Sequence, residues 1–476
     1  MKKTKIVCSI GPVTMSKEGI EKLMKAGMNL ARINFSHADH AEHLIKVNNI
    51  RSISKDTPIL LDTSGPEVRT GKVTNGLVTL EDNKDIIITT EEVIGTKEKI
   101  SISLKGITKL VEPTDLILIE DGNLELMVKE VKDKEIICQI IIGGELGNNK
   151  NVNIPNRDID LPAITEKDIE DIKFGIKHNF DFIAASFVRS KKDVEEIRSL
   201  LKQYNAEDIK IISKVEHRKA VENIDEIIKA SDGIMIARGD LAVQIETHEV
   251  PIIQKLIIKK CRKARIPCIV ATEMLQSMVK SPRPTRAEIT DVANAVFDGT
   301  DAVMLSKETT LGKFPFRTVE TMSNILENAE DTLANEKKGL EKSSCNAEAI
   351  AKYSVNAAEE LNAKFILVPT MSGSTVREIS SLRPNKNILA LTPNHKIKKQ
   401  LSLSYAVISE VMEHPQDINQ LIANATSLAY KKELVTKDDT VVITAGVPIG
   451  IAHTTNLLEI RKVQEVLEKE IILTHN

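Results

Sequence analysis

The sequence predicts an α/β protein with a parallel sheet and two further domains. From residue 1 to about 66, and again from about 166 to 335, short β-branched segments alternate with amphipathic stretches of helical length. This alternation is typical of parallel α/β sheets. Between about 67 and 165, alternating strands with Gly and Asp-Gly turns predominate, without convincing helices. A polar segment at 335–346 then leads into a last α/β pattern.

The first pattern contains eight candidate strands, which favours a (β/α)8 TIM barrel. These strands are residues 4–10, 29–36, 59–62, 181–187, 209–216, 233–237, 268–272 and 302–306. Most of them end on a polar or charged residue, and the carboxyl ends of the strands carry the active site in such a barrel. A doubly wound open sheet is the alternative.

Three domains are expected from these patterns. Residues 1–66 and 166–335 form the barrel that carries the catalytic site, 67–165 an inserted small β-barrel lid domain, and 346–476 a C-terminal α/β domain. An insertion after the third strand lies over the carboxyl ends of the strands, where a lid could exclude water. An insertion without a function fits this position equally well.

Composition excludes several classes of function. Among 476 residues, 65 Lys and Arg oppose 68 Asp and Glu without long blocks of one sign, which argues against nucleic-acid or membrane-surface partners. There is no Trp, and the five Cys are scattered without a CxxC pair, so base stacking, zinc knuckles and disulfide frameworks are not indicated. No apolar segment approaches 18 residues. We therefore expect a cytoplasmic protein that neither enters nor crosses a membrane.

The strand at 29–36 places three polar side chains on one face, because strand side chains alternate. These are Arg32, Asn34 and Ser36, and the next strand ends at Asp62 and Thr63. The oxygen-bearing residues suit a hard cation, beside an arginine that can bind phosphate. The exposed polar face of an edge strand is the alternative interpretation.

The strand at 209–216 places Lys214 and Glu216 on one face, and Asp240 follows the next strand. Two carboxylates with few other protein ligands suit Mg²⁺, which keeps waters and takes ligands from substrate. Gly239 lies before Asp240 at the start of a helical turn, where backbone N–H groups are free to bind an anion. A structural ion pair is the alternative for Lys214 and Glu216.

Two further strands end on hydroxyl residues, Thr272 and Ser306. Such residues are often helix caps, so local sequence alone does not make Thr272 catalytic. The sequence contains no GxxxxGK[ST], GxGxxG, HExxH or GxSxG motif. A phosphoryl-transfer enzyme built from these parts would hold its nucleotide without a P-loop.

A candidate effector loop follows the strand expected at 365–369, before a helix that begins near Val376. Its residues are Thr370, Ser372, Gly373, Ser374 and Thr375. Hydroxyl and N–H groups at a helix N-terminus can bind a phosphate. An ordinary Ser/Thr helix cap is the alternative.

Several long segments together resemble one family. They are KTKIVCSIGP (3–12), ARINFSH (31–37), LDTSGPEVRT (61–70), IISKVE (211–216), DGIMIARGDLA (232–242), PRPTRAEITDVANAVFDGTDAVMLS (282–306) and TAGVPIGIAHTTN (444–456). On these motifs the chain resembles the pyruvate kinases over essentially its whole length. The resemblance implies a glycolytic kinase that transfers the phosphoryl group of phosphoenolpyruvate to ADP, giving pyruvate and ATP.

The resemblance also implies roles for individual residues. Mg²⁺ is held by Glu216 and Asp240; K⁺ by Asn34, Ser36, Asp62 and Thr63; the transferring phosphate by Arg32 and Lys214; the substrate carboxylate by the backbone of Arg238, Gly239 and Asp240; the nucleotide by Arg69, His37 and Lys167. Thr272 lies on the proton route to the methylene carbon. The implied assembly is a homotetramer in which the C-terminal α/β domain is regulatory and binds a phosphorylated effector.

The sequence departs from the family pattern at Ser64 (usually Lys), Ala242 (Gly), Gln244 (Glu), Glu273 (Gln) and Lys307 (Gly). None of these changes removes an expected metal ligand. Glu67, with Thr63 and Thr70, is similar to the potassium-dependent branch and favours a K⁺ requirement. Two other functions are weighed: a Mg-dependent aldolase or lyase acting on pyruvate enolate, and a catalytically silent sugar-phosphate sensor. The set of Arg32, Lys214, Glu216, Asp240 and Thr272 argues against the sensor.

Overall fold

The computed structural model describes residues 1–476 except 156, 158–160, 334–342, 344, 449–454 and 475–476. Within this part of the chain, eight parallel strands close into a barrel in the order β1-β16-β15-β14-β13-β12-β3-β2. They are β1 (Lys5–Ser9), β2 (Leu30–Asn34), β3 (Ile59–Asp62), β12 (Phe182–Ala185), β13 (Lys210–Val215), β14 (Gly233–Ala237), β15 (Cys268–Ala271) and β16 (Ala302–Leu305). The predicted barrel is confirmed, and each of the eight candidate strands forms one strand of it.

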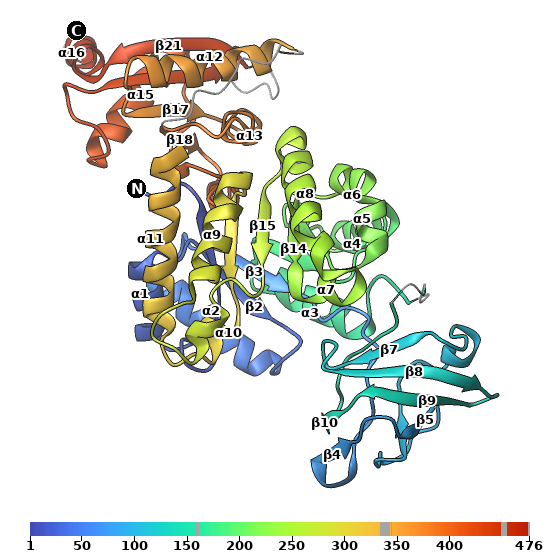
Figure 1. The fold of residues 1–476 in the computed structure, drawn as a ribbon. Coiled ribbons are helices and arrows are strands. Elements are labelled where there is room, and N and C mark those ends of the chain that lie inside the picture. Colours follow the sequence, from blue (N-terminus) through green and yellow to red (C-terminus); the bar gives the residue numbers. More distant parts are fainter. Residues whose placement is uncertain (156, 158–160, 334–342, 344, 449–454, 475–476) are drawn as a thin grey trace.

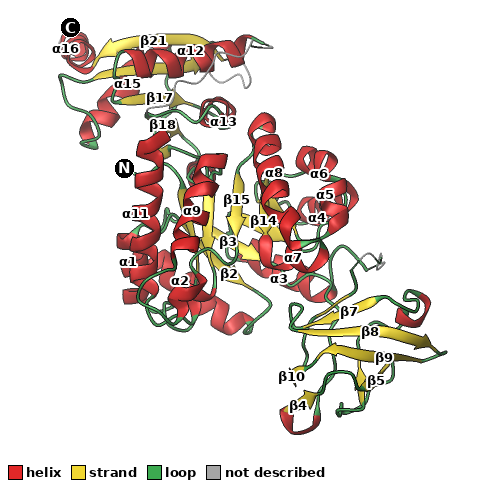
Figure 2. Ribbon diagram, viewed as in Figure 1, coloured by secondary structure: helices red, strands yellow, loops and turns green. Residues whose placement is uncertain are grey.

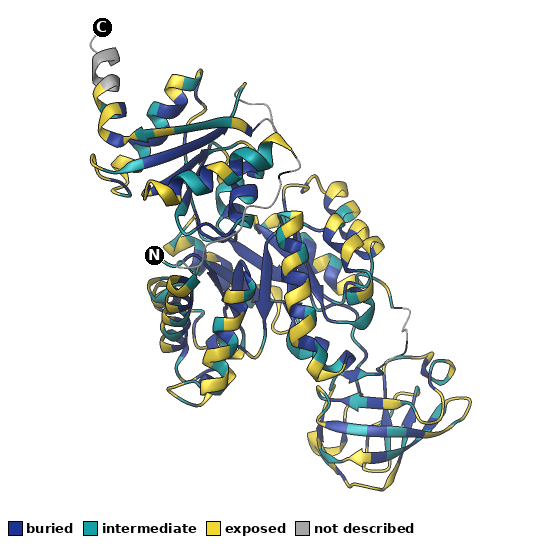
Figure 3. Ribbon diagram, turned by 45° about the horizontal axis from the view of Figure 1, so that its top comes forward, coloured by how far each residue is buried: buried dark blue, intermediate teal, exposed yellow. Residues whose placement is uncertain are grey.

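The barrel strands are buried on both faces, as expected for parallel sheets covered by helices (Figure 3). Side chains such as Ile33 and Leu61 pack outward against the helices, whereas Leu60 and Met235 fill the interior. The surrounding helices are α1 (Lys17–Ala26), α2 (His40–Ile53), α3 (Glu166–Lys177), α4 (Lys191–Gln203), α5 (Arg218–Glu222), α6 (Ile224–Ala230), α7 (Arg238–Gln244), α8 (Val250–Ala264), α9 (Arg286–Asp298), α10 (Lys307–Thr310) and α11 (Pro315–Leu333) (Figure 2). Side-chain N-caps at Asp39 and Thr165 start two of them.

The segment between β3 and α3 forms a separate β domain on one side of the barrel (Figure 1). Its strands are β4 (Leu77–Leu80), β5 (Asp85–Thr89), β6 (Lys99–Ser101), β7 (Leu116–Ile119), β8 (Leu124–Val131), β9 (Glu135–Ile142), β10 (Gly144–Gly147) and β11 (Val152–Asn153). They form the sheets β11-β7-β8-β9-β5-β6 and β10-β4, which enclose their own hydrophobic core.

The C-terminal domain has the sheet β19-β18-β17-β20-β21, in which only the pairing of β20 with β21 is antiparallel. Its elements are α12 (Asn346–Glu360), β17 (Phe365–Pro369), α13 (Ser374–Ser381), β18 (Asn387–Thr392), α14 (His395–Leu401), β19 (Val407–Val411), α15 (Ile418–Lys431), β20 (Thr440–Gly446), β21 (Thr455–Lys462) and α16 (Val463–Thr474). Most of the linker expected at 335–346, and residues 449–454 of the 444–456 motif, lie outside the described residues.

In the described part of the chain, no helix has both the length and the apolar character needed to cross a membrane. The five cysteines are free thiols, and only Cys345 is exposed.

Candidate active site

The side chains of Arg32 and Asp62 meet inside the barrel because β2 and β3 are neighbours. Asn34 is the register partner of Asp62, which places both at the carboxyl ends of the two strands. Arg32 Nε donates to Asp62 Oδ2 over 2.6 Å, and its Nη1 donates to Ser9 Oγ over 2.7 Å. Burial raises the pKa of Asp62, but Arg32 and Lys214 outweigh this effect, and the pKa is lowered overall. Asp62 is therefore a carboxylate that orients a buried guanidinium.

Lys214 lies on β13 with its ammonium group surrounded by oxygen atoms. Its Nζ is 3.1 Å from Asp62 Oδ1, 2.8 Å from Glu216 Oε1 and 2.7 Å from Ser186 Oγ. Burial lowers the pKa of Lys214, yet the carboxylates of Asp62, Glu216 and Asp240 outweigh burial and raise it overall. The site thus contains a permanently charged, almost fully buried cation.

Glu216 and Asp240 bring two carboxylates together beside Lys214. Glu216 follows β13 directly and is 1% exposed, while Asp240 lies in the first turn of α7. Burial first, and then the charge of Glu216, raise the pKa of Asp240 to about 7. This excess of negative charge is what a divalent cation would neutralise, so the pair fits a metal that takes its other ligands from water and substrate. No cluster of three or more His, Cys, Asp or Glu suited to a metal occurs among the described residues.

Thr272 follows β15 and contacts the first turn of α7. Thr272 has a φ of 67° and Glu273 a φ of 56°, a left-handed conformation that is rare for a β-branched residue and is typical of functional turns. Thr272 Oγ1 accepts a 2.8 Å hydrogen bond from the backbone N–H of Gly239. The N–H of Gly239, expected to be free for an anion, is therefore occupied. Arg238 donates to the Thr272 carbonyl over 2.8 Å and to Asp291 over 2.7 Å.

The residues expected to bind K⁺ lie at or just after the carboxyl ends of β2 and β3. One of them, Ser36, lies outside the strand in which the sequence places it. β2 ends at Asn34, so Ser36 lies in the following turn and strand parity does not orient it. The backbone N–H of Ser36 donates to Asn34 Oδ1 over 3.0 Å. Thr63 Oγ1 accepts from the Ser186 N–H over 3.1 Å. These oxygen atoms have the hard donor chemistry that suits an alkali cation.

Two family models match this chain: "Pyruvate kinase, barrel domain" over residues 1–319 and "Pyruvate kinase, alpha/beta domain" over residues 348–461. The chain belongs to the pyruvate kinase family. Curated pyruvate kinases of Staphylococcus epidermidis and Bacillus licheniformis are 46% and 45% identical to it, and each alignment covers 98% of this chain and 82% of the relative. A crystal structure of a pyruvate kinase from Cryptosporidium parvum is 39% identical with a TM-score of 0.88, over 97% of this chain and 96% of that one.

The chain is thus a glycolytic kinase that transfers the phosphoryl group of phosphoenolpyruvate to ADP, giving pyruvate and ATP. As a pyruvate kinase it needs a divalent metal. Neither alternative weighed from the sequence, the aldolase or lyase and the silent sensor, is supported by these comparisons.

The three residues implied to bind nucleotide have different surroundings in this pyruvate kinase. His37 is exposed beyond β2. Arg69 lies in the inserted domain, where it pairs with Glu67 and donates to the Asn149 carbonyl over 2.9 Å. Lys167 donates over 2.6 Å both to the Phe35 carbonyl and to the buried carboxylate of Asp171. Lys167 is therefore already engaged with the turn after β2.

The candidate effector loop joins β17 to α13, but the helix begins at Ser374, two residues earlier than predicted. Gly373 has a φ of 79°, a conformation that favours glycine, and its N–H donates to Thr370 Oγ1 over 2.9 Å. Ser372 and Ser374 share a 3.1 Å hydroxyl contact, and Thr375 Oγ1 lies 2.6 Å from Thr455 Oγ1. The loop is a compact hydroxyl-rich turn.

Sequence reasoning missed three residues that hold the site together. Ser186 accepts from Lys214 and donates over 2.7 Å to the Thr63 carbonyl; Ser9 contacts Arg32; Asp168 Oδ1 accepts the N–H groups of Ser64 and Gly65 over 3.1 Å each. Ser186 directly follows β12, so the polar strand ends that revealed Asp62 and Thr272 could have revealed it too. Among the departures, Gln244 Nε2 donates over 2.8 Å to Asn153 of the inserted domain.

Proposed function

We propose that phosphoryl transfer in this enzyme depends on Arg32 and Lys214, which bind the phosphoryl group of phosphoenolpyruvate. The main support is the position of Lys214: its side chain is buried, and its Nζ lies within 3.1 Å of oxygen atoms of Asp62, Glu216 and Ser186. A cation fixed there costs no reorganisation when negative charge spreads over the phosphoryl oxygens. During the reaction the bond from phosphorus to the enolate oxygen breaks, and a bond to an oxygen of the ADP β-phosphate forms.

Glu216 and Asp240 are proposed to hold Mg²⁺, and Asn34, Ser36, Asp62 and Thr63 to hold K⁺. When bound, these cations neutralise charge on the phosphoryl group and substrate oxygens. Support for the Mg²⁺ assignment comes from the raised pKa of Asp240, which reflects burial and the neighbouring charge of Glu216. The K⁺ requirement is supported by the resemblance of Glu67, together with Thr63 and Thr70, to the potassium-dependent branch of the family.

The remaining roles concern the substrate carboxylate, the proton and the nucleotide. The first turn of α7, at Arg238, Gly239 and Asp240, is proposed to receive the carboxylate, for which the Gly239 N–H would exchange its bond to Thr272. Thr272 then lies at the same turn and would pass a proton, through water, to the enolate carbon. The nucleotide is assigned to Arg69, His37 and Lys167.

The domains and assembly complete the proposal. Residues 1–66 and 166–335 act as the catalytic barrel, 67–165 as a lid, and 346–476 as an effector domain whose loop at Thr370, Ser372, Gly373, Ser374 and Thr375 binds a phosphorylated ligand. A homotetramer in the cytoplasm is proposed. Large apolar side chains stand exposed on α8 and α9, at Ile252, Leu256, Ile289 and Phe297, and a second copy would cover them.

A metal titration tests the central assignment. The variant Glu216→Gln should bind Mg²⁺ far more weakly in titration calorimetry and need a much higher Mg²⁺ concentration for activity. Glu273→Gln is the matched control, because it neutralises an exposed carboxylate after Thr272 without touching the proposed ligand pair. Wild-type Mg²⁺ affinity in Glu216→Gln would exclude this residue as a ligand.

A further inference from the structure

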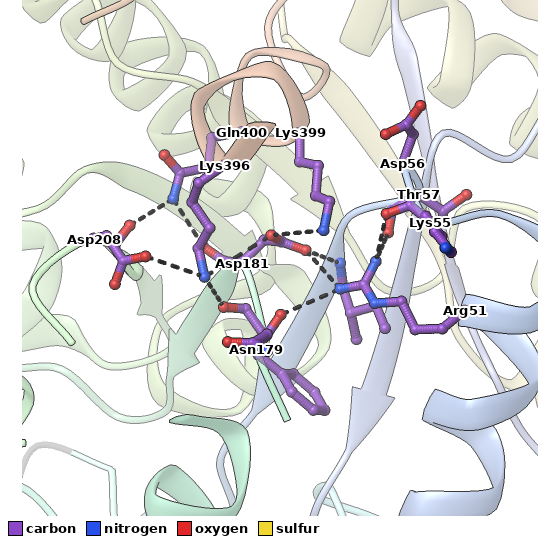
Figure 4. A network of polar contacts seen from close by, with 12 residues as sticks. Arg51, Lys55, Asp56, Thr57, Asn179, Asp181, Asp208, Lys396, Lys399 and Gln400 are labelled. Carbon is purple, nitrogen blue, oxygen red and sulfur yellow. Dashed lines mark hydrogen bonds and ion pairs between the residues drawn. The ribbon is translucent and has the colours of Figure 1, made fainter. Parts of the chain in front are cut away.

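A polar network joins α14 of the C-terminal domain to the residues just before β12 (Figure 4). These residues lie at the amino end of a barrel strand, whereas the proposed active site lies at the carboxyl ends. At its centre is Asp181, fully buried just before β12. Asp181 Oδ2 accepts from Arg51 over 3.1 Å and from the Ile59 N–H over 3.0 Å. Its Oδ1 has no hydrogen-bond partner among the described residues, but Lys396 and Lys399 of α14 lie 4.0 and 3.9 Å away. The C-terminal domain thus supplies cations for a buried carboxylate of the barrel.

The same helix also holds the backbone on both sides of Asp181. Lys396 donates to the Phe180 carbonyl over 2.6 Å, and Gln400 donates to the carbonyls of Asp181 and Asp208 over 3.3 and 2.6 Å. Just beyond α14, Leu403 is fully buried in the cluster that fills the barrel interior. The amino end of β12 is therefore held by the C-terminal domain.

The residues after the carboxyl end of β12 contact the residues proposed to act on the phosphoryl group. Ser186 accepts from Lys214 Nζ over 2.7 Å and donates to the Thr63 carbonyl over 2.7 Å. The N–H of Phe187 donates to Glu216 Oε2 over 2.7 Å. From Asp181 to Ser186 the chain is an extended segment of about 16 Å, paired on both sides within a closed barrel. This strand therefore connects Asp181 directly to Ser186.

The effector loop touches the same helix. A Cβ added to Gly373 would approach Leu401 Cδ2 to 2.7 Å, so the loop packs directly against the last residue of α14. Loop, α14, Asp181, β12 and Lys214 form one continuous series of contacts.

We propose that Asp181 is a positioning residue for Lys214, acting through β12, and that Lys396 and Lys399 let the C-terminal domain set this position. The inference rests on the role proposed above for Lys214. When α14 holds Asp181, Ser186 keeps the Lys214 ammonium at the phosphoryl site. A ligand bound at the effector loop holds α14 in this position; when α14 moves away, the strand shifts and phosphoryl transfer slows.

The test is Lys399→Met, which removes one of the α14 charges facing Asp181. We expect kcat for phosphoryl transfer to fall about 10-fold, below the roughly 10²-fold cost of a 1 Å misplacement. Exchange of the pyruvate methyl protons in D₂O, which does not need Lys214, should stay near the wild-type rate. Lys399→Arg should restore transfer. The matched control is Lys398→Met on the same helix, because Lys398 pairs with Asp56 and Glu410 instead.

A double-mutant cycle with Ser186→Ala separates this route from a general loss of stability. If Lys399 acts through Ser186, the double variant should be about as slow as Ser186→Ala alone. Three results would each overturn the proposal. The kcat losses of Lys399→Met and Ser186→Ala could multiply in the double variant, or Lys399→Met could transfer the phosphoryl group at the wild-type rate. Lys399→Met and Lys398→Met could also lose the same amount of kcat. Lys214→Met, measured in parallel, separates the role of Lys214 from its coupling to α14. If Lys214→Met transfers the phosphoryl group at the wild-type rate, the role proposed for Lys214 is wrong. If Lys214→Met is slow but Lys399→Met is as fast as the wild type, only the coupling is wrong.

Discussion

Replacing Lys214 by Met removes the ammonium group that contacts Asp62, Glu216 and Ser186 while keeping a side chain of similar length. A unit charge about 4 Å from a phosphoryl oxygen contributes roughly 4 kcal/mol at an effective dielectric constant of about 20. That energy corresponds to roughly 10³-fold in rate, in line with the 10²-fold to 10³-fold cost of losing one electrostatic stabiliser. We therefore expect kcat for phosphoryl transfer to fall by about 10²-fold to 10³-fold.

Metal binding should survive in Lys214→Met, because Glu216 and Asp240 remain and lose a competing cation 2.8 Å from Glu216. Enolisation of pyruvate should survive too, because it needs no phosphoryl group. The assay pairs ATP formation, followed by coupled absorbance, with deuterium entry into the pyruvate methyl group, followed by NMR with Mg²⁺ and K⁺ present. Lys210→Met is the control, since Lys210 starts the same strand and pairs with Asp232 at the other end.

The two activities of Lys214→Met also show whether Lys214 has another role. If Lys214→Met loses methyl exchange and keeps phosphoryl transfer, Lys214 serves the enolate and not the phosphoryl group. A loss of both activities together with weakened Mg²⁺ binding would show that Lys214 holds the whole site in place.

Three further predictions use other parts of the molecule. Thr272→Val should lose much of the pyruvate methyl exchange, measured by NMR, while ATP formation falls less; equal losses would contradict a proton role. Burial holds the pKa of His43 down at about 4, so the folded protein favours the neutral imidazole. The contribution of His43 to the free energy of unfolding is therefore fully present above pH 6.5. It should fall by about 3 kcal/mol as the pH is lowered from 6.5 to 4. Urea unfolding should show this decline, and His43→Gln should reduce it. AMP or a sugar phosphate should lower the apparent KM for phosphoenolpyruvate in the wild type but not in Ser374→Asp; unchanged activation in the variant would exclude the loop.

The barrel and the placement of Arg32, Lys214 and Glu216 could be predicted from the sequence because both follow from local periodicity. Alternation along β2 places Arg32 inside the barrel, and alternation along β13 places Lys214 beside Glu216. Lys214 lies near the carboxyl end of β13, and Arg32 reaches Asp62 at the carboxyl end of β3, where a closed parallel barrel gathers polar residues. Strand parity fails for Ser36 because β2 ends at Asn34.

Features that depend on long-range packing could not be predicted. The Gly239 N–H is satisfied by Thr272, a contact across 33 residues that only the left-handed turn after β15 explains. Lys396 and Lys399 look like ordinary solvated charges in sequence, and their proximity to Asp181 depends on how the C-terminal domain docks. Likewise, nothing local identifies His43 as buried; it packs against the Phe35 ring with centroids 4.1 Å apart.

The most direct measurement is pyruvate formation by the purified full chain from phosphoenolpyruvate and ADP, with Mg²⁺ present and either K⁺ or Na⁺ at equal ionic strength. We expect stoichiometric ATP and pyruvate, dependence on Mg²⁺, and a much higher rate with K⁺ than with Na⁺. Absence of ATP formation under these conditions would contradict the claim that these residues catalyse phosphoryl transfer. Equal rates with K⁺ and Na⁺ would contradict the proposed cation site at Asn34, Ser36, Asp62 and Thr63.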